Sequence, residues 1–207
     1  MTIRNKSYNK SLVQDRRSGP TAKILYDKKM ISAKFVEQYD FDASNVTCID
    51  VCKNTVLGSP NYQVVIYTDE EPTYLLKIYL FDESDCFHEV KYSKNFIVIG
   101  CGEKVHFFSI ENKNIHSYDL KDYFGHLYPS HDIESDVIKS DTYVASASRL
   151  FKFSPSGKLE WESEILGIDG VVIDEIENNV IRGAGEYDPP GGWERFEVRV
   201  SDGKIAI

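Results

Sequence analysis

Short hydrophobic runs alternate with polar turn residues over most of this chain, from Ile31 onward. The runs are rich in β-branched and aromatic residues, and turn residues interrupt them roughly every eight to twelve positions, which is typical of all-β folds. Helical periodicity is weak throughout. We therefore predict an antiparallel all-β fold, with strands at Gln63–Thr68, Tyr74–Phe81, Phe96–Gly100, Lys104–Ile110, Ile115–Leu120, Thr142–Ala147, Arg149–Phe153, Lys158–Glu162, Val171–Ile176, Val180–Gly183, Arg195–Val200 and Lys204–Ile207.

Three of the expected turns have a clear chemical basis. Pro155-Ser156-Gly157 combines a residue with fixed φ and one that tolerates positive φ, which suits a type I or II turn. Asp202-Gly203 is the strongest hairpin signal in the chain. Glu177-Asn178-Asn179 indicates another hairpin, because Asn accepts the left-handed conformation. Each hairpin alternates polar and apolar residues and needs a neighbour to cover its apolar face.

A strand–turn–strand unit recurs along the second half, in residues 105–120, 150–161 and 196–207. Successive turns lie about 45 positions apart, which is the length of a four-stranded propeller blade. At that length, 207 residues have room for four blades at most. We therefore predict a small or partial β-propeller-like fold, with a curled β-sandwich as the alternative.

Charge divides the chain into a basic N-terminal arm, residues 1–30, and a single all-β domain, residues 31–207. The arm holds eight basic and two acidic residues, a net charge of +6, which leaves −15 for the rest of a chain whose total is −9. An acidic body repels phosphate backbones and attracts basic proteins. We expect no direct binding to nucleic acid and a basic protein as partner.

Sequence features also predict the cellular compartment of the protein. We find no secretory signal in residues 1–20 and no run of apolar residues long enough to span a membrane. The four cysteines show neither a disulfide framework nor paired metal-ligand spacing. These observations predict a protein of the reducing cytoplasm, with free thiols.

Two segments break the β rhythm. Residues 122–129 are rich in aromatic residues and end in Pro129, and the stretch that follows, residues 130–136, is polar and acidic. Residues 183–193 contain Asp188-Pro189-Pro190-Gly191-Gly192-Trp193, in which a stiff diproline precedes two permissive glycines. Both segments are expected to be connections at the surface.

Two resemblances concern these repeats and the second segment. Residues 148–161, with the turn Pro155-Ser156-Gly157-Lys158 followed by Trp161, resemble the repeat of propellers of the pyrroloquinoline-quinone and WD types. The ending Gly183-Ala184-Gly185-Glu186-Tyr187-Asp188-Pro189-Pro190-Gly191-Gly192-Trp193 is similar to that of a widespread family of small bacterial proteins. That resemblance implies a place among toxin and immunity proteins.

No residue cluster predicts a metal or a cofactor. The five histidines lack the paired spacing of zinc ligands, so we expect no metal site. The G-x-G pairs lack the strand–helix context of a phosphate-binding loop, so we expect no cofactor. The best enzymatic reading is a hydrolase that uses Glu186 and Asp188 as acid and base, with Tyr187 and Trp193 stacking on a sugar.

The leading prediction is a non-enzymatic protein that neutralises a basic bacterial toxin, such as a nuclease, by covering its active face. Aromatic anchors within an acidic rim suit that task. The hydrolase, and a propeller-type scaffold that pairs through an open sheet edge, are the alternatives. The predicted partner-binding residues are Tyr123, Phe124, Tyr128, Asp132, Glu134, Asp136, Glu186, Tyr187, Asp188 and Trp193.

Overall fold

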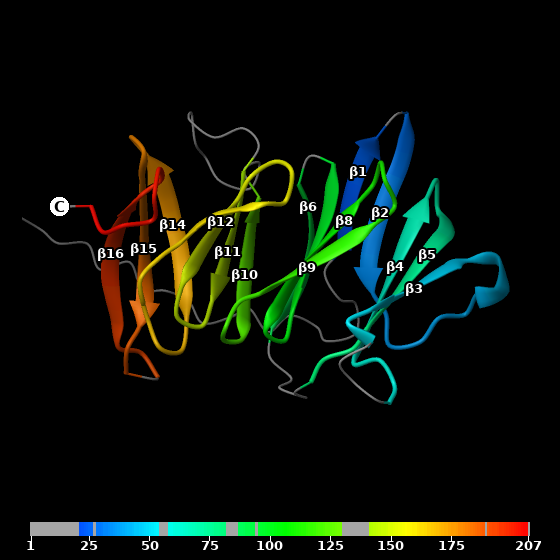
Figure 1. Cartoon of the computed structure of the whole chain (residues 1–207), viewed down its shortest axis with the longest axis horizontal. Helices are drawn as coiled ribbons and strands as arrows, with labels where there is room; N and C mark the ends of the chain where they lie inside the picture. Colours follow the sequence, from blue (N-terminus) through cyan, green and yellow to red (C-terminus); the bar gives the residue numbers. More distant parts are fainter. Residues whose placement is uncertain are drawn as a thin grey trace, which may run out of the picture.

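Four β-sheets follow one another along the long axis of the molecule, in the order of the chain (Figure 1). This computed structural model describes residues 21–26, 28–53, 58–81, 87–93, 95–129, 141–188 and 190–206. Sheet A has the strand order β1-β2-β4-β5-β3, sheet B runs β6 to β9, sheet C runs β10 to β13, and sheet D runs β14 to β16. The all-β prediction is therefore confirmed.

The described strands are short. They are β1 (Thr21–Tyr26), β2 (Lys29–Phe35), β3 (Thr47–Val51), β4 (Tyr62–Thr68), β5 (Glu71–Ile78), β6 (His88–Ser93), β7 (Phe96–Cys101), β8 (Lys104–Ser109), β9 (Ile115–Asp119), β10 (Phe124–Pro129), β11 (Thr142–Ser146), β12 (Leu150–Phe153), β13 (Leu159–Glu162), β14 (Val171–Glu177), β15 (Val180–Glu186) and β16 (Trp193–Arg199). A single 3₁₀ turn, η1 (Ala43–Asn45), is the one helical element among the described residues.

Strand pairing follows the chain closely. Sheets B, C and D are antiparallel meanders in which each strand pairs with the next. Sheet A departs from this pattern, because β3 pairs in parallel with β5. The predicted turns at residues 155–157, 177–179 and 202–203 are all present, and Gly157, Asn178, Asn179 and Gly203 adopt the positive φ that those turns require.

The structure corrects the boundary of the basic arm. Residues 21–30 form β1 and begin β2, so they belong to sheet A, whereas residues 1–20 lie outside the described part of the chain. Ala22 and Ile24 pack against the core while Lys23 points outward, exposed. Lys23 therefore lies on the outer face of β1, whereas Lys28 lies in the turn that follows and Lys29 begins β2.

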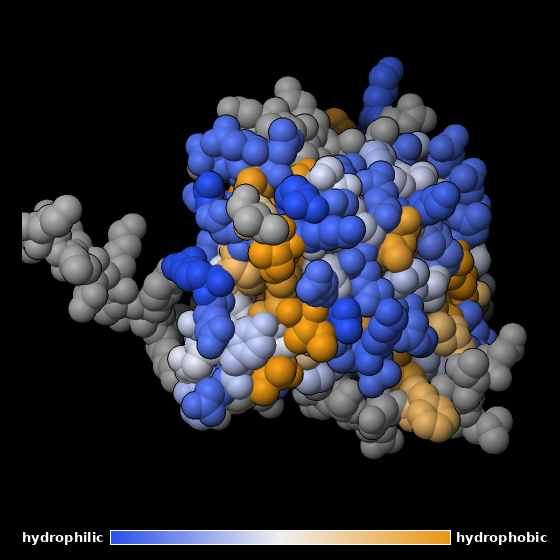
Figure 2. Space-filling view, turned by 60° about the vertical axis from the view of Figure 1, so that its left-hand side comes forward, coloured by the Kyte–Doolittle hydropathy of each residue, from blue (hydrophilic) through white to orange (hydrophobic). Residues whose placement is uncertain are grey.

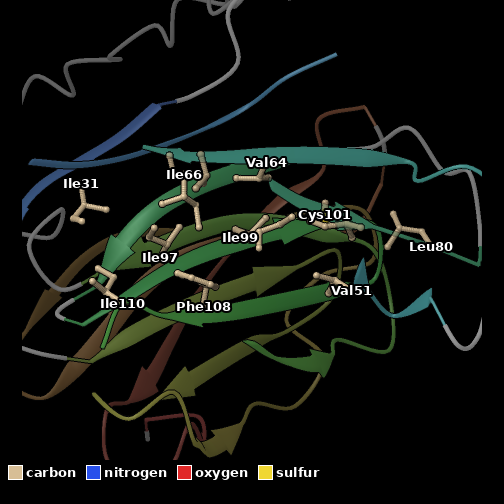
Figure 3. Close-up of a cluster of buried hydrophobic side chains, with 14 residues drawn as sticks. Ile31, Val51, Val64, Ile66, Leu80, Ile97, Ile99, Cys101, Phe108 and Ile110 are labelled. Carbon is tan, nitrogen blue, oxygen red and sulfur yellow. The ribbon is translucent and has the colours of Figure 1, made fainter. Parts of the chain in front are cut away.

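Hydrophobic cores fill the spaces between successive sheets. Figure 3 shows the first of them, where Val64 and Ile66 of sheet A meet Ile97 and Ile99 of sheet B. Between sheets B and C, Phe107 packs near Phe153, with ring centroids 4.9 Å apart. The third core joins sheets C and D and contains Trp161, whose indole N–H donates to the Val200 carbonyl oxygen at 2.9 Å. Each sheet thus stabilises the next.

The two ends of the stack are covered differently. On the outer face of sheet A, Val65 and Leu75 pack beneath Val46, which lies next to η1. The outer face of sheet D carries charge instead. There the Arg182 guanidinium hydrogen-bonds to Glu197 and Glu175, both at 2.9 Å. This charged face lines a hollow of about 590 Å³ whose floor includes Gly183 and Phe196. Neither end presents a bare apolar sheet.

The chain passes from each sheet to the next at one end of the strands, which we call the connection end. Backbone hydrogen bonds link the connections there: Phe124 N–H to Gly102 O (2.6 Å), Ala147 N–H to Tyr123 O (2.9 Å) and Leu166 N–H to Ser148 O (2.8 Å). The strands that open sheets B, C and D therefore all start at this end. β6 also contacts β1 on one side and β10 on the other.

Candidate functional site

Exposed hydrophobic side chains gather at the connection end, where sheets C and D meet. Ile165, Ile168, Tyr187 and Trp193 each expose between 39% and 56% of their surface. We call these four side chains the Trp193 patch. Figure 2 brings the sheet D side of the molecule forward and shows orange hydrophobic surface among blue hydrophilic side chains. Apolar surface that is grouped and rimmed by polar residues typically marks an interaction site.

Backbone contacts fix the patch to the end of sheet D. The Ile168 N–H donates to the Glu186 carbonyl oxygen at 2.8 Å, and the Glu186 N–H donates to Gly170 O at 2.9 Å. Gly185 makes this close approach possible, because a Cβ at that position would overlap the carbonyl oxygen of Leu166. The connection from β13 to β14 is therefore held against β15, and its exposed side chains stand on a rigid support.

Trp193 is positioned by a glycine and a carboxylate. Its cross-strand partner on β15 is Glu186, whose Oε1 accepts a hydrogen bond from the Gly191 N–H at 2.5 Å. The far edge of the indole lies over Gly170, where a Cβ would be 3.1 Å from Cη2. Gly191 has φ of 112°, a conformation that favours glycine. One side of Trp193 is thus supported, while 45% of its surface stays exposed.

Five carboxylates surround the patch without a balancing cation. The two segments that form it, residues 164–170 and 186–194, contain no Lys or Arg. Within the described residues, none of the five takes part in an ion pair, although Arg182 on the same sheet is shared among three glutamates. The negative charge of the patch is therefore available to an outside partner. The five are Glu164, Asp169, Glu186, Asp188 and Glu194.

Three of the predicted aromatic anchors take different positions. Tyr123 is half-buried and its hydroxyl donates to Asp169, so it supports the rim of the patch. Phe124 is completely buried between sheets B and C, against Gly100, and is corrected from an anchor to a core residue. Tyr128 is largely buried too, and its hydroxyl accepts from the Ile173 N–H at 3.2 Å. Burial raises the pKa of Tyr128 to about 12.

The reason for this correction is that residues 124–129 form β10, not a surface connection. Its alternation places Phe124 and Leu127 in the core between sheets B and C. Of the other predicted anchors, Tyr187 and Trp193 belong to the patch, and Glu186 and Asp188 belong to its rim. The predicted rim residues Asp132, Glu134 and Asp136 lie outside the described residues.

Sequence reasoning missed Ile165 and Ile168. Both lie in the connection from β13 to β14, outside the assigned strands. A signal was present, because Leu166-Gly167-Ile168-Asp169-Gly170 places an isoleucine between turn residues, where burial is uncommon. Two more exposed aromatics at the connection end, Phe81 and Phe87, were missed as well.

Glu186 and Asp188, the acid and base of the alternative hydrolase prediction, have the following surroundings. Glu186 is committed to the Gly191 N–H, and the Asp188 carbonyl oxygen accepts from the Gly192 N–H at 2.9 Å. Asp188 is exposed on the turn, and neither residue lines the hollow on the outer face of sheet D. The Glu186 carboxylate thus accepts a hydrogen bond within the turn, and the Asp188 side chain is exposed at the rim of the patch.

The histidines and cysteines are dispersed. Across the described ranges, no three His, Cys, Asp or Glu side chains lie close enough together to hold a metal ion. His106 is fully buried with Nδ1 2.7 Å from Ser117 Oγ, and burial lowers its pKa to about 3, so it stays neutral. Within the described residues, Cys48 and Cys101 form no disulfide.

Comparison with models of known protein families gives no match for this chain, and comparison with curated proteins gives none either. Among the residues that the structure describes, no helix has the length and hydrophobicity that a membrane crossing requires.

Proposed function

We propose that this protein is a non-enzymatic binding protein that neutralises a basic bacterial toxin, such as a nuclease, by covering the toxin's active face. The observation that carries this proposal is the Trp193 patch, in which exposed aromatic and aliphatic side chains lie among five carboxylates that form no ion pair within the described residues. A nuclease domain presents a basic face to its substrate, and an acidic rim competes for that face.

Two physical effects would act in sequence. The acidic body, residues 21–207, has a net charge of −13, because residues 1–20 carry +4 of a total of −9. That charge accelerates the encounter with a cationic partner. Burial of Trp193 and Tyr187 then supplies short-range affinity, because large amphipathic side chains dominate the binding energy of protein interfaces. The rigid attachment of the patch to β15 limits the entropy lost on binding.

We further propose that the protein acts in the bacterial cytoplasm and that the stack of sheets is an open, propeller-like arrangement. The thiols of Cys48 and Cys101, which form no disulfide within the described residues, support the first proposal. The second is supported by the consecutive meanders and by the contacts of β6 with β1 and β10, because the first strands of propeller blades lie side by side.

The test co-expresses this chain in a bacterial host with a basic nuclease toxin domain chosen as the candidate partner. We expect survival of the host and formation of a stable complex in vitro. Affinity should fall as salt is raised, because steering by exposed charges is screened. Growth arrest that this chain does not relieve, or an affinity independent of salt, would contradict the proposal.

A further inference from the structure

Sheet D is one strand short of its neighbours, and this leaves part of β16 as an open edge. Sheets B and C have four strands each, whereas sheet D has three. Among the described residues, 204–206 cover only the C-terminal half of β16, where the Ala206 N–H donates to Glu197 O (2.8 Å) and the Arg199 N–H donates to Lys204 O (2.8 Å). A single bridge, between Val198 and Ile205, results.

The hydrogen bonds to this short tail show which backbone groups of β16 point away from β15. Glu197 and Arg199 bond to the tail, so in an antiparallel pair their N–H and C=O groups lie on the outer edge. Because the pattern repeats every second residue, Arg195 and Trp193 present their N–H and C=O groups to the same edge. Within the described residues, these groups of Arg195 and Trp193 have no backbone partner.

The open edge is continuous with the Trp193 patch. Trp193 and Arg195 lie on the outer face of sheet D, and Glu194 lies between them on the opposite face, exposed. The charge of Arg195 is taken up by Asp174, with which it forms an ion pair. An incoming strand therefore meets an indole on one face and an unpaired carboxylate on the other.

We infer that the partner adds an extended basic segment to β16 as a fourth strand of sheet D, pairing antiparallel at Arg195. Such a strand continues the line of residues 204–206, and backbone hydrogen bonds supply its affinity. Alternation then sends apolar side chains toward Trp193 and places a Lys or Arg opposite Glu194. This inference rests on the proposed function, because it specifies how the basic partner is held.

The test uses a defined probe, the peptide acetyl-Thr-Lys-Val-Lys-Val-Lys-Thr-amide, and amide hydrogen exchange of the full chain. In the free protein, the Arg195 amide should exchange quickly, whereas the Glu194 and Phe196 amides, which face β15, are protected. The peptide should slow exchange at Arg195. Its glutamate counterpart, acetyl-Thr-Glu-Val-Glu-Val-Glu-Thr-amide, should leave that rate unchanged.

Arg195→Pro is the decisive variant. Proline removes the outward N–H and leaves the hydrogen bonds to β15 in place, which is where edge strands tolerate it. We expect about a tenfold loss of peptide affinity, the equivalent of one hydrogen bond. The matched control, Arg195→Ala, keeps the N–H and frees Asp174, so binding should be unchanged or tighter.

Several outcomes would overturn the inference. They are no binding of the basic peptide, equal binding by Arg195→Pro, and exchange at Arg195 that is already slow in the free protein. Binding that appears only after residues 1–20 are removed would overturn it as well, by assigning the edge to the chain's own basic segment. If Arg195→Pro fails to fold, the exchange rate of the Arg195 amide in the unaltered protein, with and without the basic peptide, still tests the inference.

The inference and the proposed function fail separately. Edge pairing with the peptide, together with no protection against the toxin, would reject the function and keep the strand-addition site. Full protection by Arg195→Pro would keep the function and reject this mode of binding.

Discussion

Glu89 on β6 and His126 on β10 bind each other across the boundary between sheets B and C. His126 Nδ1 lies 3.1 Å from Glu89 Oε1, and the Leu127 N–H donates to Oε2 at 2.9 Å. One carboxylate therefore joins two sheets that share no strand pairing. The exposed ring of Phe87 lies against the imidazole, with centroids 5.5 Å apart.

This contact predicts a pH-dependent contribution to stability. Burial raises the pKa of Glu89, but the hydrogen bonds from His126 and Leu127 outweigh it, and the net pKa is lowered. A lowered carboxyl pKa stabilises the fold above the unfolded-state value, and the effect is lost as pH falls through the folded-state value. Glu89→Gln should cost about 1–2 kcal/mol of unfolding free energy near neutral pH.

Denaturant unfolding of both proteins across pH would measure that contribution. The difference between them should shrink as the solution becomes more acidic than the ordinary glutamate range. Asp50→Asn, which alters an exposed pair with Lys53, serves as the control and should change little. A difference that is constant with pH would show that the charge of Glu89 is unimportant.

Substituting Lys152 alone should destabilise the fold much more than substituting it together with its two partners. Lys152 is almost buried on β12 and forms ion pairs with Asp141 (3.1 Å) and Glu160 (2.9 Å). Burial lowers its pKa, but these partners outweigh that effect, and the net pKa is raised. Lys152→Met leaves the two carboxylates uncompensated and should cost about 3 kcal/mol.

The triple variant Lys152→Met, Asp141→Asn, Glu160→Gln should recover most of that loss, because it removes all three charges together. Equilibrium unfolding in urea measures the unfolding free energy of the single and of the triple variant. A triple variant as unstable as Lys152→Met would mean that the lysine side chain acts through shape, not through charge.

A substitution at Gly185 would test whether the connection from β13 to β14 must lie against β15. The carbonyl oxygen of Leu166 occupies the space of a Cβ at Gly185, so Gly185→Ala must move the backbone of the patch. We expect a loss of about 3 kcal/mol, the upper range for overpacking. At Gly125, the nearest atom to a Cβ is 3.1 Å away, so Gly125→Ala should cost clearly less. Thermal unfolding of the two variants provides the comparison, and equal losses would show that Gly185 has no special constraint.

Replacing Trp193 should weaken binding more than it weakens folding. Because 45% of its surface is exposed, Trp193→Ala should lower toxin affinity by about 2 kcal/mol, roughly 30-fold, with a smaller effect on unfolding. Leu25, which exposes 66% of its surface on sheet A, is the control, and Leu25→Ala should leave affinity unchanged. Titration calorimetry with the toxin domain measures both. Equal effects of the two substitutions would mean that the patch is not the docking site.

Local pattern was sufficient for eleven of the observed strands, in sheets A to D, and for the turns between them. Apolar runs and the left-handed Asn178-Asn179 turn depend on neighbours in the chain, so they are readable in sequence. Alternation in Leu150–Phe153 was expected to leave one face wet, and this was wrong: all four residues are buried, because β12 has a core on each face. The strands missed were β1, β2, β3, β6 and β10. β10 looked like a connection because Gly125 and Pro129 interrupt it, and only burial between sheets made it a strand.

The opposite outcome occurs at Lys204–Ile207, which was predicted as a strand. Its hairpin turn forms as predicted, yet in the described residues the returning segment makes one bridge, not a strand. A turn is a local property, whereas a ladder depends on the partner edge and on what covers it.

By itself, the sequence determined the β class, the hairpins and the acidic balance of the body, because each depends on composition or on residues close in the chain. Tertiary structure alone decided which aromatics are exposed. Phe124 and Trp193 look alike as anchors in the sequence, but one fills the core between sheets B and C and the other stands at the end of sheet D. That difference comes from the stacking of sheets over long sequence distances, which no local pattern encodes.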